Sequence, residues 1–186
     1  MDNNTVRLGF LGHAAFRNGE AFRGGMLITD ANGKPVEFRS TTPVKPSALQ
    51  RTLYGDSMMP HIATELLGVP LLKSVQEKPS IILVRDEIYF GVRLQIETPL
   101  FRMQQLAANS NPSSAYTKNS QNGGEVFTST ANYTSIVVTP HQSHPADLSL
   151  CKPILTEVFN RIDLNEPFER LEHAITYVHD NKVLEE

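Results

Sequence analysis

Three apolar segments joined by turn-forming residues open the chain, and they constrain its fold more than any other feature. Residues 6–16 alternate small and large apolar side chains, residues 24–29 form a second apolar run, and residues 36–40 alternate with a period of two. Asn18-Gly19 is a favoured two-residue hairpin turn, and the Asp, Asn, Gly and Pro of residues 30–35 favour a second turn. The pattern predicts an antiparallel meander of three strands with at least one buried face.

A helical layer and a central strand are expected next. Ser47 is a good helix cap after the prolines that end the meander, and helical spacing of apolar residues continues, with a break at Gly55, as far as residue 69. Residues 80–84 are apolar at nearly every position, which is typical of a strand buried on both faces. Asp86-Glu87 is then expected to form a turn into strand-like residues 88–101.

The second half of the chain begins with a polar stretch. Residues 104–125 are rich in Asn, Ser, Gln, Gly and Thr, so they bury too little apolar surface to fold, and a flexible insertion is predicted. Residues 126–138 return to β-branched and aromatic types and predict a strand. Two helices should follow, one near residues 153–161 and one that begins with an Asp-x-x-Glu capping pattern at residues 163–166.

These elements define an α/β (α+β) protein, read as a single domain over residues 1–186. Its order is a three-strand meander, a helical layer, a central strand, a flexible insertion at 104–125, a late strand and two C-terminal helices. That order is compatible with a ribonuclease-H-like sheet and equally with a longin- or profilin-like sheet flanked by helices. A fold of this kind does not by itself fix a function.

Composition points to a water-soluble chain in a reducing compartment. Hydrophobic residues make up 40% of the sequence, which suits a packed core, and no run approaches the roughly 20 apolar residues of a membrane span. The N-terminal residues lack the features of a secretion signal, and the single Cys151 cannot form an internal disulfide. An intracellular, cytoplasmic location without membrane contact is therefore expected.

Charge is unevenly spread along the chain. Residues 1–51 hold seven Lys or Arg against four acids, giving +3, whereas residues 157–186 hold three against eight, giving −5. A basic face of this kind either attracts an anionic partner, including nucleic acid, or is only one of two solvated surfaces. The sequence leaves both alternatives open.

Catalytic motifs are absent from the sequence. It contains no Gly-x-Ser-x-Gly elbow, no Walker loop and no Gly-x-Gly-x-x-Gly fingerprint, so no cofactor is predicted. A ribonuclease-H-like nuclease would need carboxylates converging on two metal ions. The available acids are Asp30, Glu37, Asp86, Glu87 and Glu97, and such an enzyme would use some of the first four. The first strand carries no acid, so turn and surface carboxylates are the favoured interpretation of these residues.

A cluster of possible zinc ligands occurs between the late strand and the final helices. His141, His144, Asp147 and Cys151 supply ligand types that zinc accepts, but their spacing matches no known finger or ribbon. The favoured interpretation is a loop in which Asp147 caps a helix and Cys151 is buried. No metal ligand and no catalytic residue is predicted.

One cluster is richer than folding requires. Arg39, Lys45, Arg51 and Tyr54 bracket the proline-rich link into the first helix, and Arg and Tyr are enriched at the centres of interfaces. They are the predicted binding residues of a non-catalytic intracellular module that binds another protein or forms a subunit of an assembly. The alternative is a divergent metal-dependent nuclease or phosphotransfer enzyme on a ribonuclease-H-like sheet.

Overall fold

The computed structural model describes residues 6–106 and 123–181. The elements follow in this order: β1 (Arg7–Phe16), β2 (Ala21–Asp30), β3 (Pro35–Ser40), α1 (Ala48–Tyr54), η1 (Gly55–Ser57), α2 (Met58–His61), η2 (Ile62–Gly68), α3 (Val69–Ser74), β4 (Ile81–Val84), η3 (Glu87–Tyr89), α4 (Phe90–Arg93), β5 (Leu100–Gln105), β6 (Glu125–Phe127), β7 (Ile136–Pro140), α6 (Ala146–Phe159) and α7 (Glu166–Asp180). The expected flexible insertion at 104–125 lies for the most part outside the described residues, although β5 and β6 reach into its two ends.

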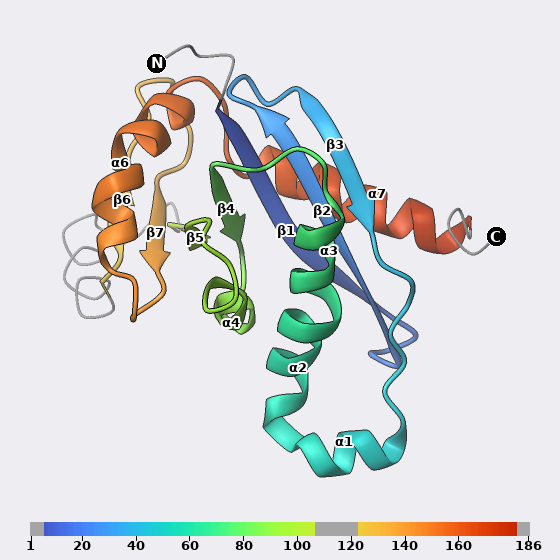
Figure 1. Ribbon diagram of the computed structural model, residues 1–186. Helices are drawn as coiled ribbons and strands as arrows, with labels where there is room; N and C mark the ends of the chain where they lie inside the picture. The colour runs from blue at the N-terminus through green and yellow to red at the C-terminus, as the bar shows by residue number, and fades with distance from the viewer. Residues whose placement is uncertain (1–5, 107–122, 182–186) are drawn as a thin grey trace.

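The seven strands of the described residues form one sheet, in the order β3-β2-β1-β4-β5-β7-β6 (Figure 1). The meander β1-β2-β3 is antiparallel, as its turn residues predict. β4 lies parallel to β1 and β5 lies parallel to β4, whereas β7 and β6 are antiparallel. The predicted mixed α/β class is therefore confirmed.

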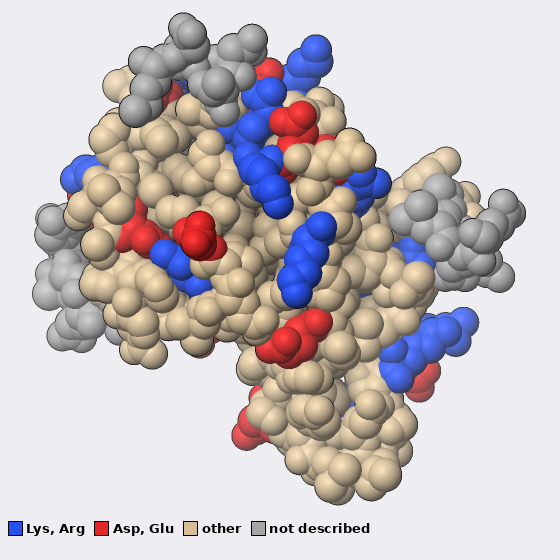
Figure 2. All heavy atoms as spheres, viewed as in Figure 1, with Lys and Arg blue, Asp and Glu red and all other residues tan. Residues whose placement is uncertain are grey.

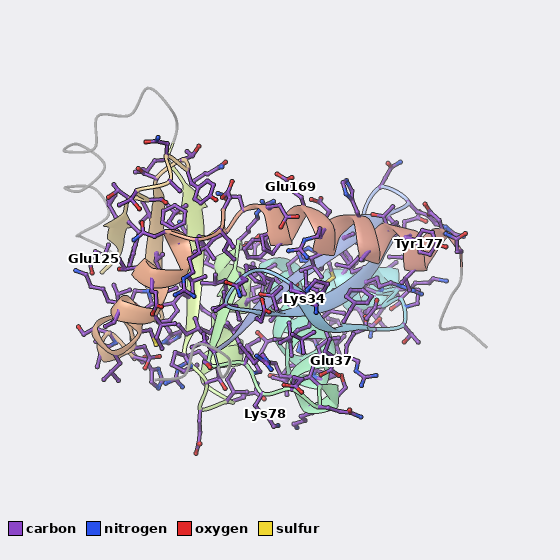
Figure 3. The ribbon with its side chains drawn as sticks, turned by 90° about the horizontal axis from the view of Figure 1, so that it is seen from above. Lys34, Glu37, Lys78, Glu125, Glu169 and Tyr177 are labelled. Atoms are coloured by element: carbon purple, nitrogen blue, oxygen red, sulfur yellow. The ribbon has the colours of Figure 1, made fainter. Side chains whose placement is uncertain are left out.

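Helices cover both faces of this sheet. α6 and α7 pack on one face, and the helical run from α1 to α3 crosses the other and projects beyond the sheet at α1 (Figures 1 and 3). β4 confirms the predicted central strand, because Ile81 and Leu83 belong to the core under α6 and α7 while Ile82 and Val84 belong to the core on the other face.

Two glycines of β2 let helices approach the sheet closely. A Cβ atom at Gly24 would lie 2.9 Å from Leu67, and one at Gly25 would lie 2.6 Å from Ile175. The two glycines thus allow close packing on opposite faces of the sheet. Helix α7 therefore lies directly against β1 and β2, where it borders the site described below.

The predicted helix cap is confirmed for α1 and is wrong for α7. Ser47 and Gln50 form a reciprocal capping box at the start of α1. α7 buries an apolar stripe, but the residue that precedes it, Asn165, makes no side-chain cap. The Asp163 carboxylate accepts hydrogen bonds from Asn165 instead of capping the helix.

Several predicted boundaries are wrong. Residues 88–101 do not form a hairpin, because Asp86 accepts a hydrogen bond from the Ile88 amide and starts the helical turns η3 and α4. Residues 126–138 divide into β6 and β7. α6 begins at Ala146, and Pro153 lies inside it, so the proline does not mark its start. Among the described residues, no helix has the length and apolar character needed to cross a membrane.

Candidate active site

A pocket lies where β4 ends beside β1. β4 pairs with residues 8–11 of β1 and stops at Val84, whereas β1 continues to Phe16. The hollow beyond the end of β4 has a volume of about 210 Å³. Its lining comes from β1, the segment after β4 and α7: Leu11, Gly12, His13, Arg85, Asp86, Tyr89, Phe168, Leu171, Glu172 and Ile175.

The position of this β1–β4 pocket is significant for function. β1 and β4 are parallel, and the pocket opens beyond the C-terminal end of β4, beside residues 11–13 of β1. The chain leaves β1 toward β2 on one side, whereas β4 connects onward to β5 on the other side. Open sheets bind their ligands at such points, because the connections diverge and leave a crevice between them.

His13 is the most constrained polar residue of the pocket. Its Nδ1 atom lies 3.0 Å from the hydroxyl of Tyr89, which is 1% exposed. Burial lowers the pKa of His13, and the charge of Asp86 opposes that shift in part. Burial, together with Asp86, raises the pKa of Tyr89. The pair therefore stays neutral at pH 7, with the His13 ring fixed through Nδ1 and with Nε2 as its second ring nitrogen.

Two carboxylates and one guanidinium complete the polar lining. Asp86 lies two residues after the end of β4 and accepts a hydrogen bond from the Ile88 amide at 3.1 Å, while Glu172 comes from α7 and is exposed. The guanidinium of Arg85 stands 4.9 Å from the ring centre of Phe168 and donates to the Asn165 carbonyl at 3.3 Å. Groups able to bind a phosphate and to move a proton thus surround one hollow.

A preformed metal centre does not fit the described side chains. No three His, Cys, Asp or Glu residues within 6–106 and 123–181 lie close enough to hold a metal ion together. The middle of β1, from Leu8 to Gly12, carries only apolar residues and glycine. The chemistry of the pocket is therefore derived from its own side chains.

The four acids considered from the sequence lie at opposite ends of the sheet. Asp30 pairs in register with Arg7 at the start of β1, and its side chain caps its own turn. Glu37 accepts hydrogen bonds from the backbone of Gln76 and Glu77, ahead of β4. Asp86 follows the far end of β4. In Figure 3, Glu37 lies across the sheet from Glu169 of α7.

Hydrogen bonding occupies two of these acids. Burial raises the pKa of Glu37, but hydrogen bonds from the backbone of Glu77, from Arg39 and from Gln76 outweigh it and leave the pKa below its ordinary value. Glu87 forms an ion pair with Arg102 at 2.5 Å. The combination of all four acids in one two-metal site is excluded by this geometry, and only Asp86 lines the pocket.

The His141 to Cys151 segment is structural. Asp147 was expected to cap a helix, and that prediction is wrong. It lies in the first turn of α6 and forms a buried bidentate ion pair with Arg93 at 2.7 and 3.2 Å. His141 accepts a hydrogen bond from the Ser143 amide. Cys151 is buried as expected, and burial raises its pKa to about 11, which disfavours the thiolate.

The predicted binding cluster is only partly assembled. Lys45 and Arg51 line one hollow at the base of α1, and Lys45 and Tyr54 line a neighbouring one. Arg39 lines neither, and it pairs with Glu37 on β3 at 2.7 Å. Whether these residues bind a partner stays a prediction from the sequence.

The fold places this chain in the ribonuclease-H-like class, one of the two sheets compatible with its element order. It is similar to the solved structure of endonuclease V from Bacillus subtilis, with a TM-score of 0.58 and 12% identity over 96% of this chain and 83% of that one. It is also similar to endonuclease V from Streptomyces avermitilis, with a TM-score of 0.55 and 12% identity over 97% and 84%. The sequence matches no protein-family model and no curated protein.

This likeness overturns the first functional prediction. The chain was expected to be a non-catalytic module that binds another protein, but its fold is shared with endonucleases, and the alternative of a ribonuclease-H-like nuclease fits better. The likeness concerns the fold alone and does not extend to the residues that line the β1–β4 pocket.

Sequence reasoning missed most of the pocket. Asp86 was considered, but His13, Tyr89 and Glu172 were not. His13 carried a signal, because it is a polar ring inside an otherwise apolar strand. Neither Tyr89 nor Glu172 had such a signal in the sequence, because only folding brings η3 and α7 beside β1.

Proposed function

We propose that this chain is an enzyme that cleaves phosphodiester bonds of nucleic acid in the β1–β4 pocket. The observation that carries the proposal is the position of a polar pocket beyond the C-terminal end of β4, beside the parallel strand β1. The fold that it shares with two endonuclease V structures supports the same reaction class. The partner that this proposal implies is nucleic acid in place of another protein.

Each polar side chain meets one need of phosphodiester hydrolysis. His13 is neutral at pH 7 because burial lowers its pKa, so Nε2 can accept a proton from an attacking water. Arg85 supplies the planar donors that suit a phosphate group. Asp86 and Glu172 orient the water by accepting its hydrogen bonds. Tyr89 acts through His13, whose ring it positions at 3.0 Å.

A cleavage assay tests the proposal. The purified chain is incubated with labelled single-stranded and duplex DNA and RNA, and the products are separated on denaturing gels. We expect wild type to cleave at least one substrate, and Asp86→Asn and His13→Gln to lower the rate about 100-fold or more, the usual contribution of a positioned acid or base. Wild type that cleaves none of the substrates would contradict the proposal.

Helix α7 offers a matched control. Glu172 lines the pocket, whereas Glu169, one turn earlier, is exposed on the outer side of the helix (Figure 3). Glu172→Gln should slow cleavage and Glu169→Gln should not. Equal rates for both variants and for Asp86→Asn would show that a contaminating nuclease, and not this pocket, produced the cleavage.

Metal binding by the free protein is a separate prediction. Because no three described ligand side chains converge, we expect titration calorimetry to detect no saturable binding of Mn²⁺ at micromolar concentrations. Saturable one-to-one binding that Asp86→Asn removes would show that the pocket holds a metal after all.

Binding of nucleic acid without cleavage is the second candidate function. It is favoured by the absence of any carboxylate from β1, the strand at the centre of the site. In that case Asp86→Asn and Arg85→Gln would change the affinity for an oligonucleotide that wild type leaves intact.

A further inference from the structure

A second hollow lies at the same end of the sheet as the β1–β4 pocket. It has a volume of about 350 Å³ between the β1–β2 turn and the start of α1. Its lining is Arg17, Glu20, Ala21, Lys45, Pro46, Ala48 and Arg51. We call it the basic hollow, because three cations and one carboxylate give it a net charge of +2. Within the described residues, none of the three cations forms an ion pair with an acidic side chain.

The β1–β2 turn holds Arg17 in an unusual conformation. Arg17 and Asn18 have φ angles of 51° and 55°, and Gly19 follows at 85°. The turn therefore has four residues, where Asn18-Gly19 predicted two. Left-handed backbone disfavours a residue with a long side chain. The exposed Arg17 side chain is nevertheless presented at the rim of the hollow.

Arg51 and the strand edge fix the geometry of the hollow. Arg51 donates from Nη2 to the Gly19 carbonyl at 2.8 Å, which ties α1 to the turn. Phe22 and Val44 exchange two backbone hydrogen bonds of 2.9 and 2.8 Å, which places Lys45 beside the start of β2. The cations are thus preorganised, with Arg51 as a positioning residue and Arg17 and Lys45 exposed to a ligand.

The basic hollow and the β1–β4 pocket share no lining residue, but β1 and the turn after it connect them. Arg17 follows the last residue of β1, four residues after His13, so their backbones lie at most about 14 Å apart. The Phe22 ring lies between the two sites, with its centre 6.2 Å from that of His13.

An aromatic pair adjoins the hollow on its other side. The rings of Tyr54 and His61 stack with centres 4.7 Å apart at an angle of 28°. Lys45 lines the groove that holds this pair as well as the basic hollow. Tyr54 is 39% exposed, so part of its ring is open to a base. A cationic groove beside exposed aromatic rings is the combination that binds single-stranded nucleic acid without strict sequence preference.

Figure 2 agrees with this arrangement. Blue spheres gather at the edge of the molecule beside the projecting helical run, where Figure 1 places the β1–β2 turn. The front of the projecting run itself shows mostly uncharged residues.

We infer that the basic hollow and the Tyr54–His61 stack bind the backbone and a base of a single-stranded segment that extends from the β1–β4 pocket. Arg17 and Lys45 contact phosphates, and Tyr54 stacks on a base. This inference rests on the proposed function, since it assigns the surface beside the same site. It also gives a role to Lys45, Arg51 and Tyr54, three of the four residues that the sequence singled out.

Fluorescence anisotropy with a labelled single-stranded oligonucleotide tests the inference. We expect Arg17→Gln and Lys45→Gln each to weaken binding several-fold and to reduce the slope of log K against log salt by about 0.7, the value for one lost phosphate contact on a single strand. Tyr54→Ala should weaken binding roughly fivefold or more through lost stacking, without changing that slope.

Two exposed residues away from the hollow serve as matched controls. Lys34 lies in the turn after β2, at the opposite end of the sheet, and Tyr177 is exposed on α7, on the opposite face (Figure 3). Lys34→Gln and Tyr177→Ala should bind as wild type does. If these controls weaken binding as much as the hollow variants do, the inference is wrong.

The remaining outcomes separate this inference from the proposed function. If Asp86→Asn abolishes cleavage while Arg17→Gln, Lys45→Gln and Tyr54→Ala bind normally, the inference fails and the proposed function stands. If no substrate is cleaved but these three variants lose affinity, the surface stands and the proposed function fails. Tighter binding of duplex, or equal competition by poly-glutamate, would overturn the single-stranded assignment.

Discussion

At the residue scale, the His13–Tyr89 pair distinguishes the site from ordinary core. A histidine in a central strand must be desolvated, and here one ring nitrogen is satisfied by a buried hydroxyl. The second ring nitrogen remains for a bound molecule in the pocket that His13 lines. The apolar pattern of residues 6–16 predicted the strand but could not show that His13 faces a hollow, because that hollow exists only where β4 stops.

The lowered pKa of His13 predicts how stability depends on pH. Its native pKa lies below the unfolded value, so the unfolded state takes up a proton first as pH falls below about 6.5. The contribution of the neutral His13 to the free energy of unfolding should therefore be fully present near pH 7 and decline toward pH 5. His13→Gln should flatten this decline in urea titrations. His141, whose pKa is also lowered by burial, by His144 and by Arg93, contributes to the remaining slope. An unchanged slope in His13→Gln would contradict the assignment.

The buried Arg93–Asp147 ion pair predicts a large effect on stability. Asp147→Ala leaves the Arg93 guanidinium without its bidentate partner in a buried position, and we expect a loss of about 3–5 kcal/mol in the free energy of unfolding. Glu87→Gln removes the exposed partner of Arg102 and should cost less than about 1 kcal/mol. Equal losses of unfolding free energy for the two variants in chemical denaturation would contradict the prediction that the buried Arg93–Asp147 pair matters more than the exposed one.

At the scale of elements, the sequence predicted the helices and strands that have a regular apolar pattern. It failed where a local hydrogen bond favours a different structure from the one that the pattern indicates. The meander, β4 and α7 follow from periodicity, because each buries a defined face. Residues 88–101 contain β-forming side chains, yet the Asp86 carboxylate caps a helical turn there. Pro153 suggested a helix start, but α6 includes it and begins at Ala146.

The helical run beside the site contains a π-helix, from which we predict that one glycine substitution destabilises the fold. Residues Ile62–Gly68 form a π-helix, a rare form that is frequent at functional sites. A Cβ atom at Gly68 would lie 2.8 Å from the Ala63 carbonyl oxygen, which is backbone and cannot move aside. Gly68→Ala should therefore cost about 1–3 kcal/mol, as overpacking does.

Gly12→Ala is the control for that prediction. A Cβ atom at Gly12 meets only the Leu171 side chain, at 3.4 Å, so this substitution should be clearly less destabilising in thermal unfolding. A loss for Gly12→Ala as large as that for Gly68→Ala would mean that the π-helix does not require a glycine.

At the scale of the whole molecule, the fold was within reach of the sequence and the site was not. The order of strands and helices narrowed the fold to two sheet types, and one of them is correct. The site depends on which strand ends meet, and neither Glu172 nor Tyr89 signals its place beside β1 in the linear pattern. Lys45, Arg51 and Tyr54 were singled out from the sequence because they lie close together along the chain, and their role in binding stays a prediction.

The central claim is that the β1–β4 pocket acts on nucleic acid, and amide chemical-shift mapping of isotope-labelled protein tests it most directly. Titration with a single-stranded oligonucleotide should shift the amides of Gly12, His13, Arg85 and Asp86 first, with saturation at one site. Shifts confined to other surfaces, or no shifts at all at concentrations that saturate the anisotropy signal, would contradict the claim.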